Sequence, residues 1–201
     1  MALVSFMILF IIWAVAHSIT AAAPFKRWVR RKVGARAYDG FYRLFYNVVA
    51  VVTFVPVLYV AATSVPHQVL WRVRGAWRWI FLFIQVVAFV ALVFSLWQTD
   101  PLHFAGVRQA YRFLRGDEEV DPPRPFIRRG VYALVRHPLY LFSMLFIWFA
   151  PVVTLGTFLF NLIATVYFLL GAVHEERRLL REFGDTYRRY RDEVPSFIPF
   201  L

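Results

Sequence analysis

The sequence contains no cysteine. That absence excludes disulfides, thiolate metal sites, cysteine nucleophiles and thioether-linked haem, while histidine chemistry remains possible. Acidic residues are also few, since 12 Asp and Glu accompany 23 Lys and Arg, for a formal net charge of +11. A basic chain can bind nucleic acid, but that class presents its charge on one face of a soluble fold. Here the chain is 60% apolar with a mean hydropathy of +0.56, and its charges lie between long apolar runs. The composition therefore indicates a lipid environment and no nucleic acid partner.

Four stretches have no Lys, Arg, Asp or Glu, and each is long enough to cross a bilayer: Ala2–Phe25, Leu44–Trp71, Trp79–Thr99 and Pro138–Val173. No basic residue precedes the first, and it is longer than the core of a cleaved signal peptide, so we expect a membrane span there. The last has 36 residues and would form a helix of roughly 54 Å, against a hydrocarbon core of about 30 Å. Pro151, Thr154 and Gly156 near its middle favour two shorter spans joined by a tight turn.

The sequence thus predicts an all-α, polytopic integral membrane protein with about five transmembrane helices in a single domain over residues 1–201. The expected spans are 2–23, 44–64, 79–99, 138–153 and 156–173, followed by a tail over 174–201, with a long loop over 100–137.

The distribution of basic residues predicts the orientation, because cytoplasmic loops carry an excess of Lys and Arg. With five spans, the first loop, the long loop and the tail hold seven, seven and six basic residues, which is 20 of the 23. Only Arg72, Arg74 and Arg78 lie on the opposite side. We therefore expect the N-terminus outside, the C-terminus in the cytoplasm, and a location in the bacterial inner membrane.

Two polar features flank the last hairpin, the segment Gly130–Tyr140 and the segment His174–Arg178, and antiparallel packing should make them neighbours. Pro138 suits the first turn of a helix, so Arg136 and His137 lie at a helix entrance that can bind an anion. Arg136 can equally be a membrane-interface anchor.

Glu175 and Glu176 directly follow an apolar run, where carboxylates are costly without cations. Arg178 or Arg181 on the same helix is the simplest partner by spacing.

Other polar residues near the same face are His17, Gln98, Asp100 and His103. We expect Asp100 with Pro101 to end a helix, and His17 to be an interfacial hydrogen-bonding group. The polar segment Gly116–Arg129 is expected to be extended, as a connector or as a lid.

The last seventy or so residues resemble the isoprenylcysteine carboxyl methyltransferase and phospholipid methyltransferase superfamily. The ordered motif that carries the resemblance comprises Gly130, Tyr132, Arg136, His137, Pro138, Tyr140, Glu175, Glu176, Phe183, Gly184, Tyr187, Tyr190, Val194, Pro195 and Pro199. The N-terminal half, with His17 and Ser18, is more similar to bacterial relatives that include the NnrU-like group.

The resemblance implies methyl transfer from S-adenosylmethionine to a lipidic or small hydrophobic acceptor at the cytoplasmic face, with no metal. The implied catalytic residues are Arg136, His137 and Glu175. The implied cofactor-binding residues are Tyr132, Arg136, His137, Pro138, Tyr140, Glu175, Glu176 and Tyr187. Aromatic faces and a carboxylate would stabilise the sulfonium, while Arg136 would hold the cofactor's carboxylate. His137 or a glutamate would serve as base if the acceptor must lose a proton.

Two alternatives remain open at this point. Sterol reductases share a similar Arg-His-x-x-Tyr helix entrance but bind NADPH, whose 2′-phosphate needs basic contacts. A non-catalytic membrane subunit or transporter is the other, for which Asn47, Gln85 and Asn161 are the polar residues deep within the spans.

Overall fold

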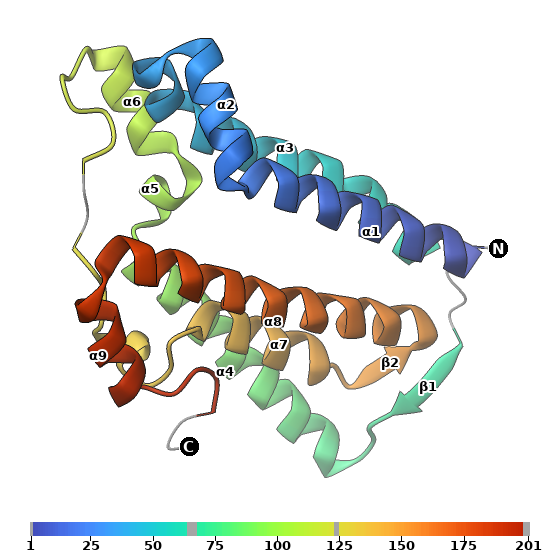
Figure 1. The fold of residues 1–201 in the computed structure, drawn as a ribbon. Helices are drawn as coiled ribbons and strands as arrows, with labels where there is room; N and C mark the ends of the chain where they lie inside the picture. Colours follow the sequence, from blue (N-terminus) through green and yellow to red (C-terminus); the bar gives the residue numbers. More distant parts are fainter. Residues whose placement is uncertain (1, 64–67, 123–124, 199–201) are drawn as a thin grey trace. The chain divides into compact units, whose positions relative to one another are not determined.

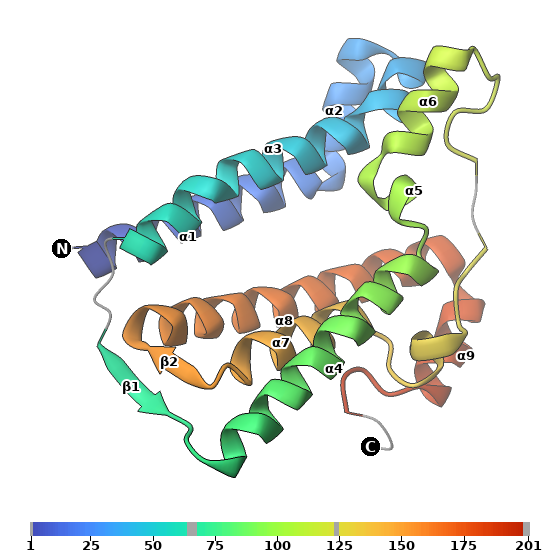
Figure 2. The same cartoon turned by 180° about the vertical axis from the view of Figure 1, so that it is seen from behind.

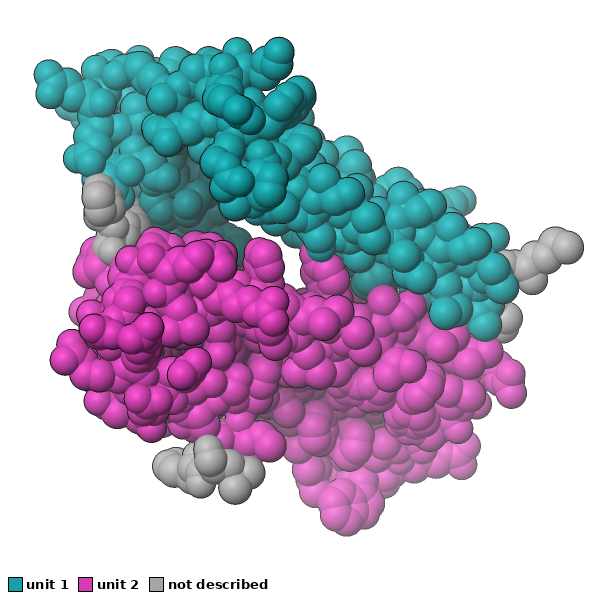
Figure 3. Space-filling view, viewed as in Figure 1, with its two compact units in different colours: residues 1–66, 100–124 teal, residues 67–99, 125–201 magenta. Residues whose placement is uncertain are grey.

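The structure, a computed structural model, describes residues 2–63, 68–122 and 125–198. The chain divides into two compact units, Met1–Pro66 with Asp100–Arg124, and His67–Thr99 with Pro125–Leu201 (Figure 3). The end of the second expected span at residue 64, Arg124 in the long loop and Pro199 of the C-terminal motif lie outside the described residues.

The first unit contains the helices α1 (Ala2–Ala21), α2 (Ala23–Val33), α3 (Ala35–Thr63), α5 (Pro101–Ala105) and α6 (Val107–Arg115) (Figure 1). α1 packs against α3, where Trp13 Nε1 donates a hydrogen bond to the Ala50 carbonyl at 3.1 Å. α3 also packs against α6, and Gly40 permits this approach because an added Cβ there would lie 2.8 Å from the Phe113 side chain.

The second unit contains β1 (Val69–Arg72), α4 (Ala76–Gln98), the short 3-10 helix η1 (Gly130–Ala133), α7 (Pro138–Trp148), β2 (Val152–Thr154), α8 (Leu155–Phe183) and α9 (Asp185–Glu193). α7 lies beside both α4 and α8, as Figure 2 shows. Rings from α4 and α7 meet at Phe89 and Phe146, whose centroids are 5.8 Å apart.

The long uncharged run forms two helices, as the sequence predicts. α7 ends at Trp148 and α8 begins at Leu155, where Thr154 and Thr157 cap the new helix reciprocally. Across the hairpin, Trp148 Nε1 donates to Thr165 Oγ1 at 2.8 Å. The two flanks of the hairpin therefore return to the same end of the unit.

The described residues are mostly helical and include four helices long and apolar enough to cross a membrane, namely α1, α3, α4 and α8. This supports an all-α integral membrane protein. The predicted fourth span corresponds to α7, which has 11 residues and a length of about 16 Å.

Several predicted bounds differ from the helices observed. α3 begins at Ala35 rather than near residue 44, and α8 continues to Phe183 rather than ending near residue 173. A charge-free window marks only the lipid-facing part of a helix, whereas charged side chains can continue the same helix into water. The expected long loop likewise contains α5, α6 and η1.

A small antiparallel pair, β1 with β2, is an addition to the all-α prediction. Val69 pairs with Thr154 and Arg72 with Val152, with an irregularity between them. The pair joins the segment before α4 to the turn between α7 and α8. Short segments at one end of neighbouring helices satisfy their backbone groups in this way, and too few residues take part to give a sequence signal.

Three amide side chains within the spans bond to backbone carbonyls. Asn47 donates to the Phe104 carbonyl at 2.9 Å, Gln85 to that of Phe146 at 3.0 Å, and Asn161 to that of Ile147 at 2.8 Å. These bonds join neighbouring helices within a unit, so each amide has a structural role.

Candidate active site

The site is built around the segment that leads into α7. η1 begins at Gly130, whose φ of +62° favours glycine. The Gln98 side chain at the end of α4 donates to the Arg129 carbonyl at 3.3 Å and accepts from the Val131 amide at 3.2 Å. A Cβ on Gly130 would lie 1.8 Å from Gln98 Nε2. Glycine is therefore needed here for both its φ and its lack of a side chain.

Arg136 is held by the protein on every side of its guanidinium. Its Nε and Nη2 each lie 2.9 Å from Glu176 Oε1, and its Nη1 donates at 2.8 Å to the carbonyls of Arg191 and Val194. Only 12% of the side chain is exposed. The geometry thus gives Arg136 a positioning role, joining α7, α8 and α9.

The backbone at the helix entrance is also engaged. The amide of Arg136 donates to the Pro195 carbonyl at 2.9 Å, and that of His137 donates to the Ser196 carbonyl at 3.2 Å. These two amides, expected from the sequence to be available to an anion, bind the C-terminal segment instead. The polypeptide after α9 therefore lies across the entrance to α7.

His137 lies between the two glutamates of α8. Its Nε2 is 3.1 Å from Glu176 Oε1, and its Nδ1 is 3.7 Å from Glu175 Oε2. Arg178 lies 3.4 Å from Glu175, as the spacing along the helix predicts. The two carboxylates thus pair with different cations. Glu176 pairs with the largely buried Arg136, and Glu175 pairs with the exposed Arg178.

Side-chain exposure distinguishes Glu175, which can contact a ligand, from Glu176 and His137, which are less exposed. Glu175 is 35% exposed, whereas Glu176 is 20% exposed and His137 only 2%. Three rings stack beside Glu175: His137 with Tyr140 at 5.8 Å between centroids, and Tyr140 with Phe168 at 5.6 Å. The hairpin therefore presents an accessible carboxylate beside aromatic faces, an arrangement suited to an organic cation.

α9 supplies a second wall through two buried tyrosines. Gly184, with φ +52°, separates α8 from α9 and turns Tyr187 and Tyr190 onto Phe126. Tyr190 donates to the Tyr132 carbonyl at 2.6 Å, and burial raises the pKa of Tyr190 to about 12. Together these contacts fix η1 against α9.

The Tyr187 hydroxyl has no hydrogen-bond partner among the described residues, although its side chain is 0% exposed. Burial raises its pKa, and the negative charge of Glu176 adds to that effect, opposed by Arg136. A buried, unsatisfied hydroxyl close to this ion pair is a group that a bound ligand or water can satisfy.

All eight residues predicted to bind a cofactor lie in the second unit, around the α7 entrance, α8 and α9. Burial raises the pKa of Tyr132, and the negative charge of Glu175 raises it further. The Tyr132 phenol therefore lies close enough to Glu175 to be affected by its charge. Pro138 is the first residue of α7 and is buried.

Two aromatic residues at the site, Phe168 and Phe197, were not predicted from the sequence. The ring centroid of Phe197 lies 5.5 Å from that of His137. Phenylalanines in an apolar chain with 22 of them give no signal of their own.

Of the other polar residues singled out, Gln98 belongs to the second unit, and His17, Asp100 and His103 belong to the first. Asp100 accepts from the His103 amide at 3.2 Å and pairs with Arg108 at 2.8 Å, so it caps α5, just beyond the end of α4. His17 lies 2.6 Å from the Tyr46 hydroxyl. Within the described ranges, no group of three or more His, Cys, Asp or Glu residues is arranged to hold a metal ion.

Comparison with known proteins gives both a family and relatives of known activity. The model of the NnrU protein family matches residues 5–193. Methanethiol S-methyltransferase 2 of Bradyrhizobium diazoefficiens is 31% identical over 97% of this chain and 72% of its own length. Methanethiol S-methyltransferase of Pseudomonas deceptionensis is 32% identical over the whole chain and 74% of its own length.

A more distant relative extends the likeness to the superfamily recognised from the C-terminal motif. Protein-S-isoprenylcysteine O-methyltransferase of Schizosaccharomyces pombe is 33% identical over 56% of this chain and 53% of its own length. No solved structure matches the chain significantly. The chain belongs to the NnrU family, and its relatives identify it as a membrane-bound methyltransferase.

Proposed function

We propose that the chain transfers a methyl group from S-adenosylmethionine to a small thiol at the cytoplasmic side of the membrane. The observation that carries this proposal is the accessible carboxylate of Glu175 beside the stacked rings of His137 and Tyr140. The names of the relatives support a thiol as the acceptor.

The residues present fit the methyl donor. When bound, S-adenosylmethionine supplies an electrophilic methyl group on a positively charged sulfur. Glu175 and the faces of Tyr140 and Phe168 can stabilise that cation, and the unsatisfied Tyr187 hydroxyl can bond to a polar group of the ligand. Arg136 and Glu176 hold these groups in place through the ion pair that joins α7 to α8.

Methylation of a thiol forms one carbon–sulfur bond, breaks another and releases the thiol proton. We infer that Glu175 accepts this proton and that the His137 ring, 3.7 Å from it, can share it. Alignment of the two sulfur atoms with the methyl group, and exclusion of water, would supply most of the rate. The apolar faces of the hairpin can both position the reactants and exclude water.

We also propose five crossings, with the N-terminus outside. Gly130 lies beside Gln98 at one end of α4, and β2 pairs with β1 just before the other end. The segment that contains α7 therefore extends along the whole length of α4, a helix of 23 residues, although α7 itself is short. The excess of basic residues in the first loop, the long loop and the tail supports a cytoplasmic site.

A binding measurement with purified protein tests the cofactor. We expect S-adenosylmethionine to bind wild-type protein, and Glu175→Gln to weaken binding at least tenfold. Glu182→Gln, about two turns further along α8 and 50% exposed, should leave binding unchanged. NADPH, titrated in parallel, should not compete. Well-folded protein that binds NADPH in place of S-adenosylmethionine would refute the proposal.

A headspace assay tests the acceptor. Incubation with S-adenosylmethionine and methanethiol should release dimethyl sulfide, and the Glu175→Gln variant should release little. A protein that binds the donor but methylates only lipid or prenylated acceptors would keep the cofactor assignment and overturn the choice of a small thiol.

A further inference from the structure

The first unit has a hollow of about 430 Å³ that is lined by Arg27, Arg30 and Arg31 of α2 and by Ala35, the first residue of α3. The hollow is open to one side rather than enclosed. Arg30 and Arg31 follow Arg27 by three and four residues, so the three arginines share one face of the helix. None of the described residues that line the hollow is acidic. It therefore presents three guanidinium groups with no carboxylate among them.

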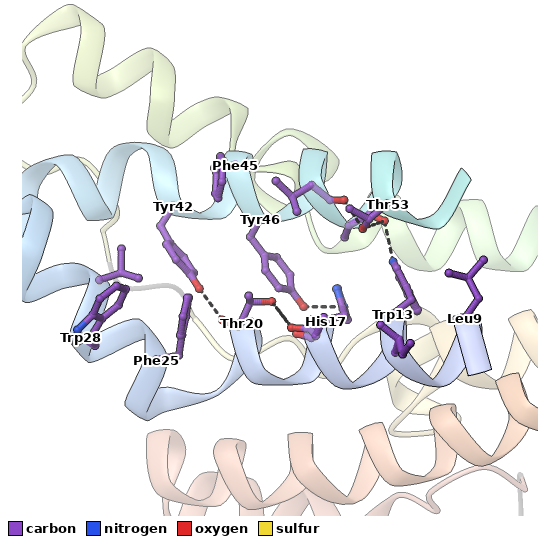
Figure 4. Close-up of a pocket in the computed structure, with 15 residues that line it drawn as sticks. Leu9, Trp13, His17, Thr20, Phe25, Trp28, Tyr42, Phe45, Tyr46 and Thr53 are labelled. Carbon is purple, nitrogen blue, oxygen red and sulfur yellow. Dashed lines mark hydrogen bonds between the residues drawn. The ribbon is translucent and has the colours of Figure 1, made fainter. Parts of the chain in front are cut away.

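The opposite face of α2 is apolar. Phe25, Trp28 and Val29 line a separate cavity of about 540 Å³ with α1 and α3 (Figure 4). α2 also follows α1 with only Ala22 between them, and α1 is long and apolar enough to cross a membrane. A short helix with one apolar and one basic face is typical of helices that lie in the membrane interface. We therefore expect the hollow to lie at the depth of the lipid head groups.

Among the described residues, only one of the three arginines has an acidic partner. Arg30 donates to Asp39 at 3.1 Å, and its guanidinium carbon lies 6.0 Å from the centroid of the Tyr38 ring, so α3 orients this side chain. In the described part of the chain, neither Arg27 nor Arg31 forms an ion pair. Like charges three or four residues apart on a helix repel each other, and an anion bound between them offsets that repulsion.

The lining favours a phosphate group, because the planar N–H donors of a guanidinium can bond two phosphate oxygens at once. A phosphate ion alone would fill only part of the hollow, since 430 Å³ corresponds to roughly 14 water molecules of about 30 Å³ each. A phosphodiester with a polar substituent matches the volume better. Phospholipids carry such a group at the interface in which we expect α2 to lie.

We propose that this hollow binds the head group of an anionic phospholipid, with the phosphate between Arg27 and Arg31. Charge complementarity selects an anionic head group, while the volume and the position directly after α1 select a lipid over a free phosphate ion. Arg30, already oriented by Asp39, adds a third positive charge. The proposal does not depend on methyl transfer or on the site in the second unit.

Native mass spectrometry in a non-ionic detergent tests the proposal. We expect dioleoyl phosphatidylglycerol to bind about tenfold more tightly than dioleoyl phosphatidylcholine, because the chains are identical and the head groups differ in net charge. Arg31→Gln should weaken binding of phosphatidylglycerol about fivefold, the contribution of one basic residue near a membrane surface. Lys32→Gln is the matched control, since Lys32 is the next residue on α2, is exposed and does not line the hollow. Equal losses in the two variants would reveal a general effect of charge and overturn the proposal.

A variant that keeps every charge tests the location. Ala35 is exposed and lines the hollow, so Ala35→Phe should fill part of it and weaken the binding of phosphatidylglycerol. Binding unaffected by Ala35→Phe, in protein with an unchanged melting temperature, would overturn the proposal. If Ala35→Phe does not fold, the comparison of Arg31→Gln with Lys32→Gln decides.

Inorganic phosphate distinguishes the two sources of a phosphate group. We expect inorganic phosphate, added at the same concentration as phosphatidylglycerol, to leave the lipid bound. Displacement of the lipid under these conditions would mean that the hollow takes a soluble anion, and the assignment to a lipid would be wrong.

Discussion

Arg136 and Glu176 are 40 residues apart in the sequence and form an ion pair in which Nε and Nη2 of the arginine share one carboxylate oxygen, each at 2.9 Å. The pair is largely buried, with 12% and 20% of the two side chains exposed. Because Arg136 also donates to two carbonyls near the end of α9, this single guanidinium joins three helices.

We expect the loss of either partner to destabilise the protein. Arg136→Ala or Glu176→Gln leaves the other charge buried and unpaired, which costs about 3 kcal/mol and lowers the melting temperature by roughly 5–10 °C. Arg136→Lys should recover little, because lysine lacks the planar fork. Arg188→Ala is the control: Arg188 pairs with Asp185 at 3.0 Å, but both side chains are more than two-thirds exposed, so little change is expected. Equal melting temperatures for Arg136→Ala and Arg188→Ala would contradict the structural role.

Gly130→Ala should be destabilising for two separable reasons. Its φ of +62° strains any other residue by about 1–2 kcal/mol, and its new Cβ displaces the Gln98 amide, which loses two hydrogen bonds. Gly116→Ala isolates the first effect, since Gly116 has φ +88° but open space around it.

A double-mutant cycle in thermal unfolding separates these contributions. The combined Gly130→Ala/Gln98→Ala protein should be more stable than the sum of the two single changes predicts. Strict additivity would show that the two residues do not interact.

Tyr190→Phe and Tyr187→Phe should differ although the two side chains are neighbours. Removal of the Tyr190 hydroxyl breaks its bond to the Tyr132 carbonyl and costs about 1 kcal/mol. Removal of the Tyr187 hydroxyl, which has no partner among the described residues, should leave stability unchanged or slightly raised. Instead, Tyr187→Phe should weaken S-adenosylmethionine binding. The expected contrast fails if Tyr187→Phe destabilises the protein as much as Tyr190→Phe and binds the donor normally.

Stability at alkaline pH should depend on Tyr190. An unfolded tyrosine ionises near pH 10, whereas burial raises the pKa of Tyr190 to about 12 in the folded protein. Between these values the folded state keeps a proton that the unfolded state has lost, so the free energy of unfolding decreases as pH rises. The melting temperature of Tyr190→Phe should therefore fall less steeply above about pH 10 than that of the wild type.

The sequence was most informative where charge and helix-breaking residues interrupt apolar runs. The absence of charge from Pro138 to Val173, with Pro151 near its middle, predicted the hairpin, and the hairpin in turn predicted that Arg136 would lie near the Glu175–Glu176 pair. Helix ends outside the apolar windows were predicted poorly, because charged residues are compatible with both helix and loop.

Which arginine pairs with which glutamate of the site could not be predicted from the spacing of the residues along the sequence. Arg178 lies three residues after Glu175 on α8 and pairs with it, whereas Glu176 pairs with Arg136, which is 40 residues earlier in the sequence. That choice depends on the C-terminal segment, whose Pro195 and Ser196 carbonyls bind the amides of Arg136 and His137. Contacts between segments so far apart leave no periodicity in one sequence.

The absence of cysteine makes the proposed topology directly testable by labelling. Single cysteines at Arg74, Glu118 and Asp192 would each be a unique site for a membrane-impermeant maleimide, and all three positions are exposed. We expect Arg74→Cys to react in intact cells, and Glu118→Cys and Asp192→Cys only after permeabilisation.

The decisive comparison is between Glu118→Cys and Asp192→Cys. If the α7–α8 hairpin crosses twice, both cysteines lie on the same side, and the side is cytoplasmic because the loop and tail carry most of the arginines. If α8 alone crossed the membrane, Asp192→Cys would react from the opposite side. Arg136 and Glu176, in contact at 2.9 Å, would then have to lie at opposite ends of a membrane-spanning helix. Reaction of these two cysteines from opposite sides would therefore contradict the hairpin and the proposed site together.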